Sequence, residues 1–151
     1  MVERTLVLLK PDTIQRGLAG RVISRLEDRG LKIVGMKMVQ MDIALANRLY
    51  AEHVNKPFFS GFSEFMMSRP IVAMAVEGKN ATEVVRATMG ATDPQNAAPG
   101  TIRGDFGTDI GRNIIHGSDS PKAAERELGI LFGDGETFDY DRETDRWITE
   151  A

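Results

Sequence analysis

The two histidines are the side chains of this sequence best suited to nucleophilic chemistry. His116 ends a short apolar run and is followed at once by Gly117-Ser118-Asp119-Ser120, so its ring would emerge beside small polar groups and a helix start. A neutral imidazole can act as a nucleophile when an acceptor holds its far nitrogen, and Glu127 on the following helix could be that acceptor. Position alone also allows His116 a structural role. His53 lies late in a predicted helix, where a surface role is the default.

Three cationic side chains could form a phosphate site. The sequence has no G-x-x-x-x-G-K-[ST] motif, and the glycines between residues 100 and 111 do not spell G-x-G-x-x-G. A phosphate site would therefore be built from side chains. Lys10 follows a predicted strand, Arg86 lies on a predicted helix and Arg103 lies in a glycine-rich loop; arginine suits bidentate contacts to phosphate. Taken singly, each of the three is more typical of a surface cation.

The apolar pattern switches repeatedly between extended and helical periods, and we find no internal repeat or linker. Near-continuous apolar runs predict strands at 5–9, 71–76 and 113–116, and a longer strand at about 31–41 with a bulge near Gly35. Helices are predicted from 3.6-residue periodicity and capping signals. Their inward or capping residues are Leu18, Val22, Ile23 and Leu26; Asp42, Leu45 and Leu49; Phe58, Phe62, Phe65 and Met66; the Asn80–Glu83 capping box; and Ser120, Ala124, Leu128 and Leu131. The phenylalanine stripe is core by default, although Phe58 and Phe59 at the helix start could offer one exposed ring for stacking.

Between residues 91 and 112 this periodicity breaks, and the segment contains two prolines and several glycines. A loop of that length inside a compact domain is either disordered or functional. With the two middle helices set aside, the order β-α-β-β-α-β predicts a ferredoxin-like α+β sandwich: a four-stranded antiparallel sheet with helices, and a long glycine-rich loop before the last strand. This fold hosts many unrelated functions and does not identify one.

Length and composition fit a single domain over residues 1–151. The chain has no cysteine, which excludes disulfides and thiolate metal sites. No stretch of about 18 apolar residues could span a membrane, and MVERTLVLLK does not read as a secretory signal, so we expect a cytoplasmic protein.

The net charge of −3 argues against a nucleic-acid binder. Residues 133–151 form an acidic C-terminal extension with seven acids and two arginines, a net charge of −5, which leaves +2 for residues 1–132. The body of the protein can therefore host an anion site, while the extension is most simply a solvated surface.

Several sequence segments, considered together, indicate a function more specifically than the spacing of single residues does. Residues 113–120, NIIHGSDS, resemble the active-site signature of the nucleoside diphosphate kinase family, and residues 99–106, PGTIRGDF, resemble the segment that leads into it. The resemblance covers essentially the whole chain in the family's order. It includes residues 9–12, 15–18, 50–53, 56–59 and 86–92.

This resemblance implies an enzyme that moves the γ-phosphoryl group of a nucleoside triphosphate to a nucleoside diphosphate by a ping-pong mechanism. His116 matches the histidine that is phosphorylated during turnover. Tyr50 matches a hydroxyl near the transferred phosphate, and Ser118 and Glu127 match hydrogen-bonding partners around the histidine.

The resemblance also implies a nucleotide site. The matched phosphate ligands are Lys10, Arg86, Thr92 and Arg103, with Lys10 and Asn113 also facing the ribose 3′-hydroxyl. Phe58 matches the ring on which the base stacks and Ile110 the apolar residue opposite. Phe62 stands where the family often has a smaller leucine, so it could narrow the base cleft.

The implied cofactor is Mg²⁺, held mainly by the nucleotide phosphates rather than by a protein metal site. The implied partners are nucleoside di- and triphosphates such as ATP, GTP and ADP, together with further copies of the chain. The C-terminal extension favours a homohexamer. Neither a membrane nor a nucleic-acid partner is expected. A nucleotide-sensing module and a nucleic-acid binder are the alternatives, and the presence of His116 together with Lys10 and Asn113 favours the enzyme.

Overall fold

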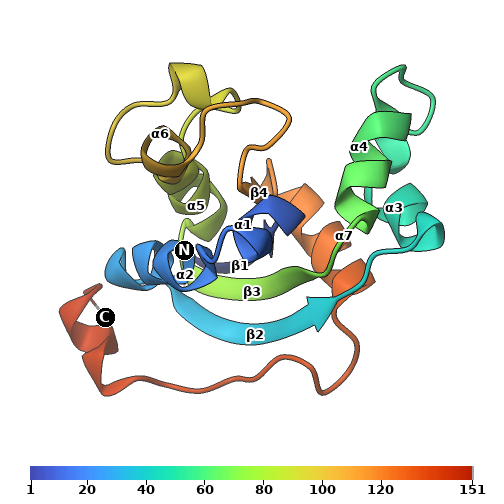
Figure 1. The fold of residues 1–151 in the computed structure, drawn as a ribbon. Coiled ribbons are helices and arrows are strands. Elements are labelled where there is room, and N and C mark those ends of the chain that lie inside the picture. Colours follow the sequence, from blue (N-terminus) through green and yellow to red (C-terminus); the bar gives the residue numbers. More distant parts are fainter. Residues whose placement is uncertain (151) are drawn as a thin grey trace.

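The computed structural model describes residues 1–150, and a four-stranded sheet lies at its centre (Figure 1). The strands are β1 (Val2–Leu9), β2 (Lys32–Val39), β3 (Ile71–Lys79) and β4 (Ile115–Gly117). Their order is β2-β3-β1-β4, and every neighbouring pair is antiparallel. The predicted ferredoxin-like α+β fold is confirmed.

Helices cover both faces of the sheet. They are α1 (Pro11–Gln15), α2 (Ala19–Asp28), α3 (Ile43–Leu49), α4 (Phe59–Met67), α5 (Ala81–Met89), α6 (Ile102–Phe106) and α7 (Pro121–Leu131), with single 3₁₀ turns at Ala51–His53, Pro94–Asn96 and Glu143–Trp147. Within residues 1–150 no helix is long and apolar enough to cross a bilayer.

The central strand β1 supplies two hydrophobic cores. Its side chains alternate in direction, as in any strand. Val7 and Leu9 pack in the core that contains residues of α2 and α5, whereas Leu6 and Leu8 pack in the core that contains residues of α3, α4 and α7. All four side chains are fully buried, which explains why the sequence shows a continuous apolar run here.

Local signals in the sequence set several boundaries as predicted. The Asp42 carboxylate accepts a hydrogen bond from the Leu45 N–H at 2.8 Å and caps α3. The Ser120 hydroxyl accepts from the Ala123 N–H at 3.0 Å and caps α7. The pairing of β2 with β3 shifts register at Gly35, which confirms the predicted bulge.

The predicted capping box at Asn80–Glu83 is wrong. Asn80 adopts a left-handed backbone conformation with a φ of 52°, and its side chain caps nothing. The Thr82 N–H is instead bonded at 3.0 Å to the carboxylate of Glu3, on the neighbouring strand β1. The first turn of α5 is thus capped by the carboxylate of Glu3, which is distant in the sequence, and not by a neighbouring side chain.

Three other local predictions also need correction. The helix α4 begins at Phe59 and buries Phe59, Ser63 and Met66, while Phe58 precedes it and is 54% exposed. The loop before the last strand contains the helix α6, whose first turn is capped by the Thr101 hydroxyl. The last strand is also shorter than predicted, because β4 begins at Ile115.

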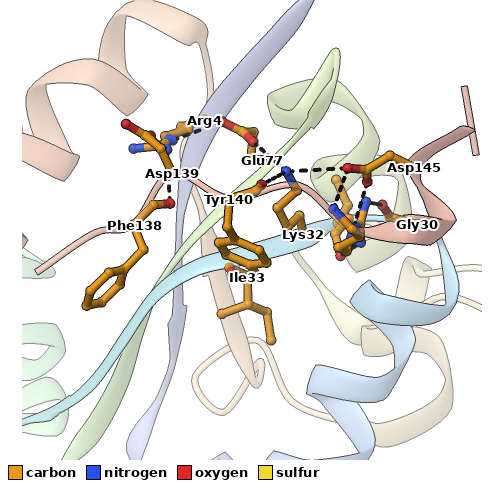
Figure 2. Close-up of polar contacts among 11 residues, drawn as sticks. Arg4, Gly30, Lys32, Ile33, Glu77, Phe138, Asp139, Tyr140 and Asp145 are labelled. Carbon is orange, nitrogen blue, oxygen red and sulfur yellow. Dashed lines mark hydrogen bonds and ion pairs between the residues drawn. The ribbon is translucent and has the colours of Figure 1, made fainter. Parts of the chain in front are cut away.

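The C-terminal strap, residues 133–150, crosses the β2 side of the sheet and ends beside α2 (Figure 1). Its acids join an ion-pair chain that Figure 2 shows. Arg4 contacts Asp139 of the strap and Glu77 of β3, and Lys32 of β2 lies 3.4 Å from Glu77 and 3.7 Å from Asp145. Two of the seven acids of the extension, Asp139 and Asp145, are therefore placed against buried or half-buried cations.

Candidate active site

A cavity of about 240 Å³ lies where the end of β1, α5, α6, β4 and α7 meet. Its wall holds Lys10, Leu49, Tyr50, Glu52, His53, Arg86, Met89, Thr92, Arg103, Asn113, His116, Gly117, Asp119, Ala123, Arg126 and Glu127. Eight of the twelve residues singled out from the sequence are among them. The other four, Phe58, Phe62, Ile110 and Ser118, lie outside this wall.

His116 stands on the short edge strand β4, paired with Leu8 of β1. Its Nε2 lies 2.8 Å from a carboxylate oxygen of Glu127, and the Ser118 hydroxyl donates to the same oxygen at 2.8 Å. Burial alone would raise the pKa of Glu127, but the hydrogen bonds from His116 and Ser118 outweigh it and lower that pKa. An ionised Glu127 favours the proton on Nε2, so the lone pair lies on Nδ1, which has no hydrogen-bond partner within residues 1–150.

Lys10 follows β1 directly and is buried, with 8% of its surface exposed. Its ammonium group donates to the Asn113 side-chain oxygen at 2.7 Å, and the Asn113 amide donates to the Thr92 carbonyl at 3.0 Å. Burial lowers the pKa of Lys10 to about 8; the charge of Arg103 adds to this effect and the charge of Asp12 opposes it. Lys10 is thus a buried cation whose charge Asp12 compensates only in part.

Arg103 is also buried, and its guanidinium donates hydrogen bonds to the backbone. It donates to the carbonyls of Asn113, Gly90 and Ile115 at 3.0, 3.2 and 2.6 Å. A guanidinium has five N–H groups, so donors remain for a ligand. Burial and the nearby charge of Arg86 lower the pKa of Arg103 to about 10. An anion in the cavity would relieve the repulsion between these cations.

Ile114, which lies between two of the three acceptors of Arg103, adopts a strained conformation. Ile114 has a φ of 75°, and the Ile115 N–H donates to the Asn113 carbonyl at 2.8 Å. Together these features define a γ-turn of the rare, strained kind. A positive φ at a β-branched residue is a genuine outlier and costs on the order of 1–3 kcal/mol. Such strain persists only where surrounding contacts hold it.

Tyr50 closes another side of the cavity from the end of α3. Its ring packs edge-on against Phe62 at 4.7 Å and His116 at 6.0 Å between centroids. Burial and the charge of Glu127 raise the pKa of Tyr50, so the hydroxyl keeps its proton. That hydroxyl is buried and has no hydrogen-bond partner within residues 1–150. Arg126 of α7 fixes this region by donating to the Arg48 and Leu49 carbonyls at 3.0 and 2.9 Å.

Two of the candidate base-binding residues, Phe58 and Phe62, pack against residues of the cavity wall. Phe58 is exposed, and its ring centroid is 5.6 Å from that of His53, which lines the cavity. Ile110, 57% exposed, lies in the tight turn between Asp109 and Arg112. The Arg112 guanidinium stacks 4.2 Å above the Phe65 ring, which joins this turn to α4.

Gly117 sets the spacing between α5 and β4. A Cβ atom there would lie 2.5 Å from the Met89 sulfur and 3.1 Å from a Val85 methyl group, both buried on α5. Arg86, on the same helix, reaches the Gly117 carbonyl at 3.4 Å. The close approach of helix and strand therefore depends on the missing side chain.

Comparison with known proteins decides the family. The nucleoside diphosphate kinase family model matches residues 3–137. The chain is 56% identical over 149 residues to the nucleoside diphosphate kinase of Archaeoglobus fulgidus, covering 99% of each chain. The chain belongs to the nucleoside diphosphate kinase family.

A second relative in the nucleoside diphosphate kinase family, from Desulforamulus reducens, is 55% identical and matches over 99% of this chain and 100% of its own. Among solved structures, a halophilic nucleoside diphosphate kinase from Halobacterium salinarum in complex with CDP superposes with a TM-score of 0.96 at 53% identity. It covers 99% of this chain and 100% of its own. The family membership thus rests on sequence and fold over almost the full length.

Several cavity residues of this nucleoside diphosphate kinase family member were not selected from the sequence as functional. Glu52, His53 and Asp119 line the cavity, and His53 had been given a surface role. Glu52 and His53 lie in the family-like segment 50–53 and Asp119 in the segment 113–120, so the resemblance to the family is the sequence signal that indicates them. For Arg126, no pattern in the sequence points to its contacts with the end of α3.

Proposed function

We propose that this chain is a nucleoside diphosphate kinase that carries the transferred phosphoryl group on Nδ1 of His116. One observation carries the proposal. Glu127 engages Nε2 of His116, and the ring lies in the wall of a cavity that also presents Lys10, Arg86 and Arg103. An oriented imidazole facing three cations suits nucleophilic attack on a phosphoryl group better than a structural role.

The first half-reaction would use the Nδ1 lone pair of His116. It attacks the γ-phosphorus of a nucleoside triphosphate, the bond from that phosphorus to the β,γ-bridging oxygen breaks, and the diphosphate leaves with the electron pair. In the second half-reaction a β-phosphate oxygen of another diphosphate attacks the phosphorus, and the N–P bond breaks. Glu127 holds the Nε2 proton throughout, so the imidazole returns unchanged.

We assign the phosphates to the cationic wall. Arg86 and the unused donors of Arg103 would contact phosphate oxygens, and Thr92 would contribute from the end of α5. Lys10 and Asn113, already bonded to each other at 2.7 Å, would meet the ribose 3′-hydroxyl and the phosphates. The Tyr50 hydroxyl, buried without a partner in residues 1–150, would gain an acceptor. Fixed donors of this kind stabilise charge that develops in the transition state.

Mg²⁺ fits this site as a companion of the nucleotide. Within residues 1–150 no cluster of three or more His, Cys, Asp or Glu side chains could hold a metal, so the nucleotide phosphates would be its main ligands. When bound, the ion neutralises phosphate charge. Positioning and proton placement are left to the protein residues described above.

The base would stack on Phe58, with Ile110 opposite and Phe62 nearby. The exposed Phe58 ring adjoins His53 of the cavity wall, while the Phe62 ring lies 5.5 Å from the Lys10 ammonium. These three side chains offer faces and methyl groups rather than hydrogen-bonding edges. Stacking of this kind accepts every base, so we propose a broad range of nucleoside di- and triphosphates as substrates; CDP is bound by the Halobacterium relative.

We further propose a homohexamer that acts in the cytoplasm, where its nucleotide substrates are found. The acidic C-terminal extension supports the hexamer by resemblance, and exposed apolar side chains such as Met36, Met38 and Trp147 suit burial between copies. Light scattering would measure the assembly. The division into one domain over 1–151 with an extension at 133–151 stays a prediction, as does the lack of nucleic-acid binding.

The decisive experiment is phosphorylation with radiolabelled ATP. The protein should acquire an acid-labile, base-stable label and discharge it to an added diphosphate. His116→Ala should fold, bind ADP and acquire no label, while His53→Ala, the matched control, should keep the label. Exchange by the His116→Ala protein would contradict the mechanism. Nucleotide binding by the wild-type protein without exchange would favour a sensing module instead.

A further inference from the structure

The strained γ-turn at Ile114 is held by Lys10, which follows β1, and by Asp12 and Thr13 in the first turn of α1. The Ile114 N–H donates to a carboxylate oxygen of Asp12 at 3.0 Å. The Ile114 carbonyl accepts from the Lys10 N–H at 3.0 Å and from the Thr13 hydroxyl at 2.6 Å. Both backbone polar groups of Ile114 are thus satisfied by three groups from residues 10–13, about 100 positions away in the sequence.

The residues on either side of Ile114 belong to the phosphate site. The Asn113 side chain accepts the Lys10 ammonium hydrogen bond, and the Asn113 and Ile115 carbonyls both accept from Arg103. His116 follows one residue later. If the turn relaxed to an extended conformation, these carbonyls and side chains would shift relative to Arg103 and Lys10.

We infer that Asp12 is a positioning residue for phosphoryl transfer, because its carboxylate holds the Ile114 turn that aligns Lys10, Asn113 and Arg103 with His116. This inference rests on the proposed function, which assigns those four residues to the reaction. Asp12 itself touches no reacting atom in this scheme.

The placement of the Asp12 carboxylate supports this role over a merely stabilising one. Asp12 is 8% exposed, and its second carboxylate oxygen is buried without a hydrogen-bond partner in residues 1–150. Burying an acceptor oxygen in this way is unfavourable. The arrangement therefore keeps a strained turn and an unsatisfied oxygen together at the cavity edge, a combination typical of functional sites.

The test compares Asp12→Ala with Asp12→Asn at pH 6.5, which is below the Lys10 pKa of about 8. Both variants lose the same carboxylate charge, so the electrostatic effect on Lys10 is common to both. Alanine removes the acceptor for the Ile114 N–H, whereas asparagine keeps a neutral oxygen there. We expect Asp12→Ala to lower kcat/KM roughly 10- to 100-fold, the equivalent of a lost hydrogen bond to a charged group. Asp12→Asn should stay within about threefold of the wild type, since a neutral acceptor is weaker but present.

Glu3→Ala is the matched control. It removes another carboxylate that caps a backbone N–H at 3.0 Å, at the start of α5, and should lower thermal stability while kcat changes little. A direct readout is the Ile114 amide proton, followed by NMR hydrogen exchange: protected in the wild type and in Asp12→Asn, and unprotected in Asp12→Ala.

Three outcomes would overturn the inference: wild-type kcat/KM in Asp12→Ala, equal losses in the two Asp12 variants, or an unchanged Ile114 amide in Asp12→Ala. If Asp12→Ala fails to fold, Thr13→Val takes its place, because it removes only the hydroxyl that donates to the Ile114 carbonyl. This variant should lower kcat while KM changes little. An unchanged kcat would overturn the inference. Failure of the proposed function is distinct, since the wild-type protein would then show no exchange.

Discussion

The buried ammonium group of Lys10 should make phosphoryl transfer sensitive to pH between about 7 and 9, a range in which a surface lysine stays protonated. Its pKa is lowered to about 8 by burial and by Arg103, against about 10.4 for an unperturbed lysine. The protonated form is the one that would bind the nucleotide. Its contribution is therefore present below pH 8 and is lost as the pH rises through that value.

The magnitude follows from the fraction of Lys10 that is protonated in the free enzyme, which kcat/KM reports. With a pKa of about 8, about nine-tenths is protonated at pH 7 and about one-tenth at pH 9. We therefore expect kcat/KM to fall roughly tenfold between these values and roughly tenfold more by pH 10. A lysine of ordinary pKa would lose less than about 5% over pH 7 to 9.

Two variants separate Lys10 from other titrating groups. Asp12→Asn removes the charge that opposes the lowering of the Lys10 pKa, so its profile should break at a lower pH. Lys10→Arg keeps the positive charge at all these pH values, so its profile should be flat above pH 7 even if its activity is reduced. The nucleotide phosphates titrate lower, near pH 6. A wild-type kcat/KM that is flat from pH 7 to 9.5 would refute the assignment of Lys10.

Two further predictions concern the arginine and the aromatic ring. Arg103→Lys should lower kcat by about two to three orders of magnitude, by analogy with the loss of one preorganised donor. It should also lower the Tm, because a lysine cannot replace the donation of Arg103 to three carbonyls. Stopped-flow kinetics would measure kcat and calorimetry the Tm, and an unchanged kcat would exclude Arg103 from the site. Phe58→Ala should lower kcat/KM roughly 5- to 150-fold for GDP, ADP, CDP, UDP and dTDP alike. A wild-type preference beyond about a thousandfold for one base would instead reveal a polar group that reads the base edge.

The fold could be predicted largely from the sequence where the signal was local. Asp42 and Ser120 cap helices through neighbouring N–H groups, and Gly35 marks a bulge in a strand whose polar residues change parity. The failures involve contacts across the chain. Glu3 replaces the Asn80 cap from another strand, and no local pattern shows which of Phe58 and Phe59 will face the core, since either ring extends the same helical stripe.

The candidate site divides in the same way. The family motifs placed Lys10, Asn113 and His116 in the sequence, and the structure places them around one cavity. The supporting contacts could not be predicted, because they depend on backbone geometry: Arg103 donates to three carbonyls, and Asp12 holds the strained Ile114 turn. Periodicity reports which side chains are buried, but not which carbonyls converge on a guanidinium.

The absence of a side chain at Gly117 limits which residues can occupy this position next to His116. Arg86 is carried by α5 and His116 by β4, and these two elements meet at this glycine, so the separation between the Arg86 guanidinium and the His116 ring depends on how the helix and the strand pack. A Cβ atom at 117 would lie 2.5 Å from the Met89 sulfur and 3.1 Å from a Val85 methyl group, so a larger residue there requires these buried side chains, or the elements that carry them, to move. The spacing between Arg86 and His116 is therefore coupled to the packing of the sheet against α5 at this one position.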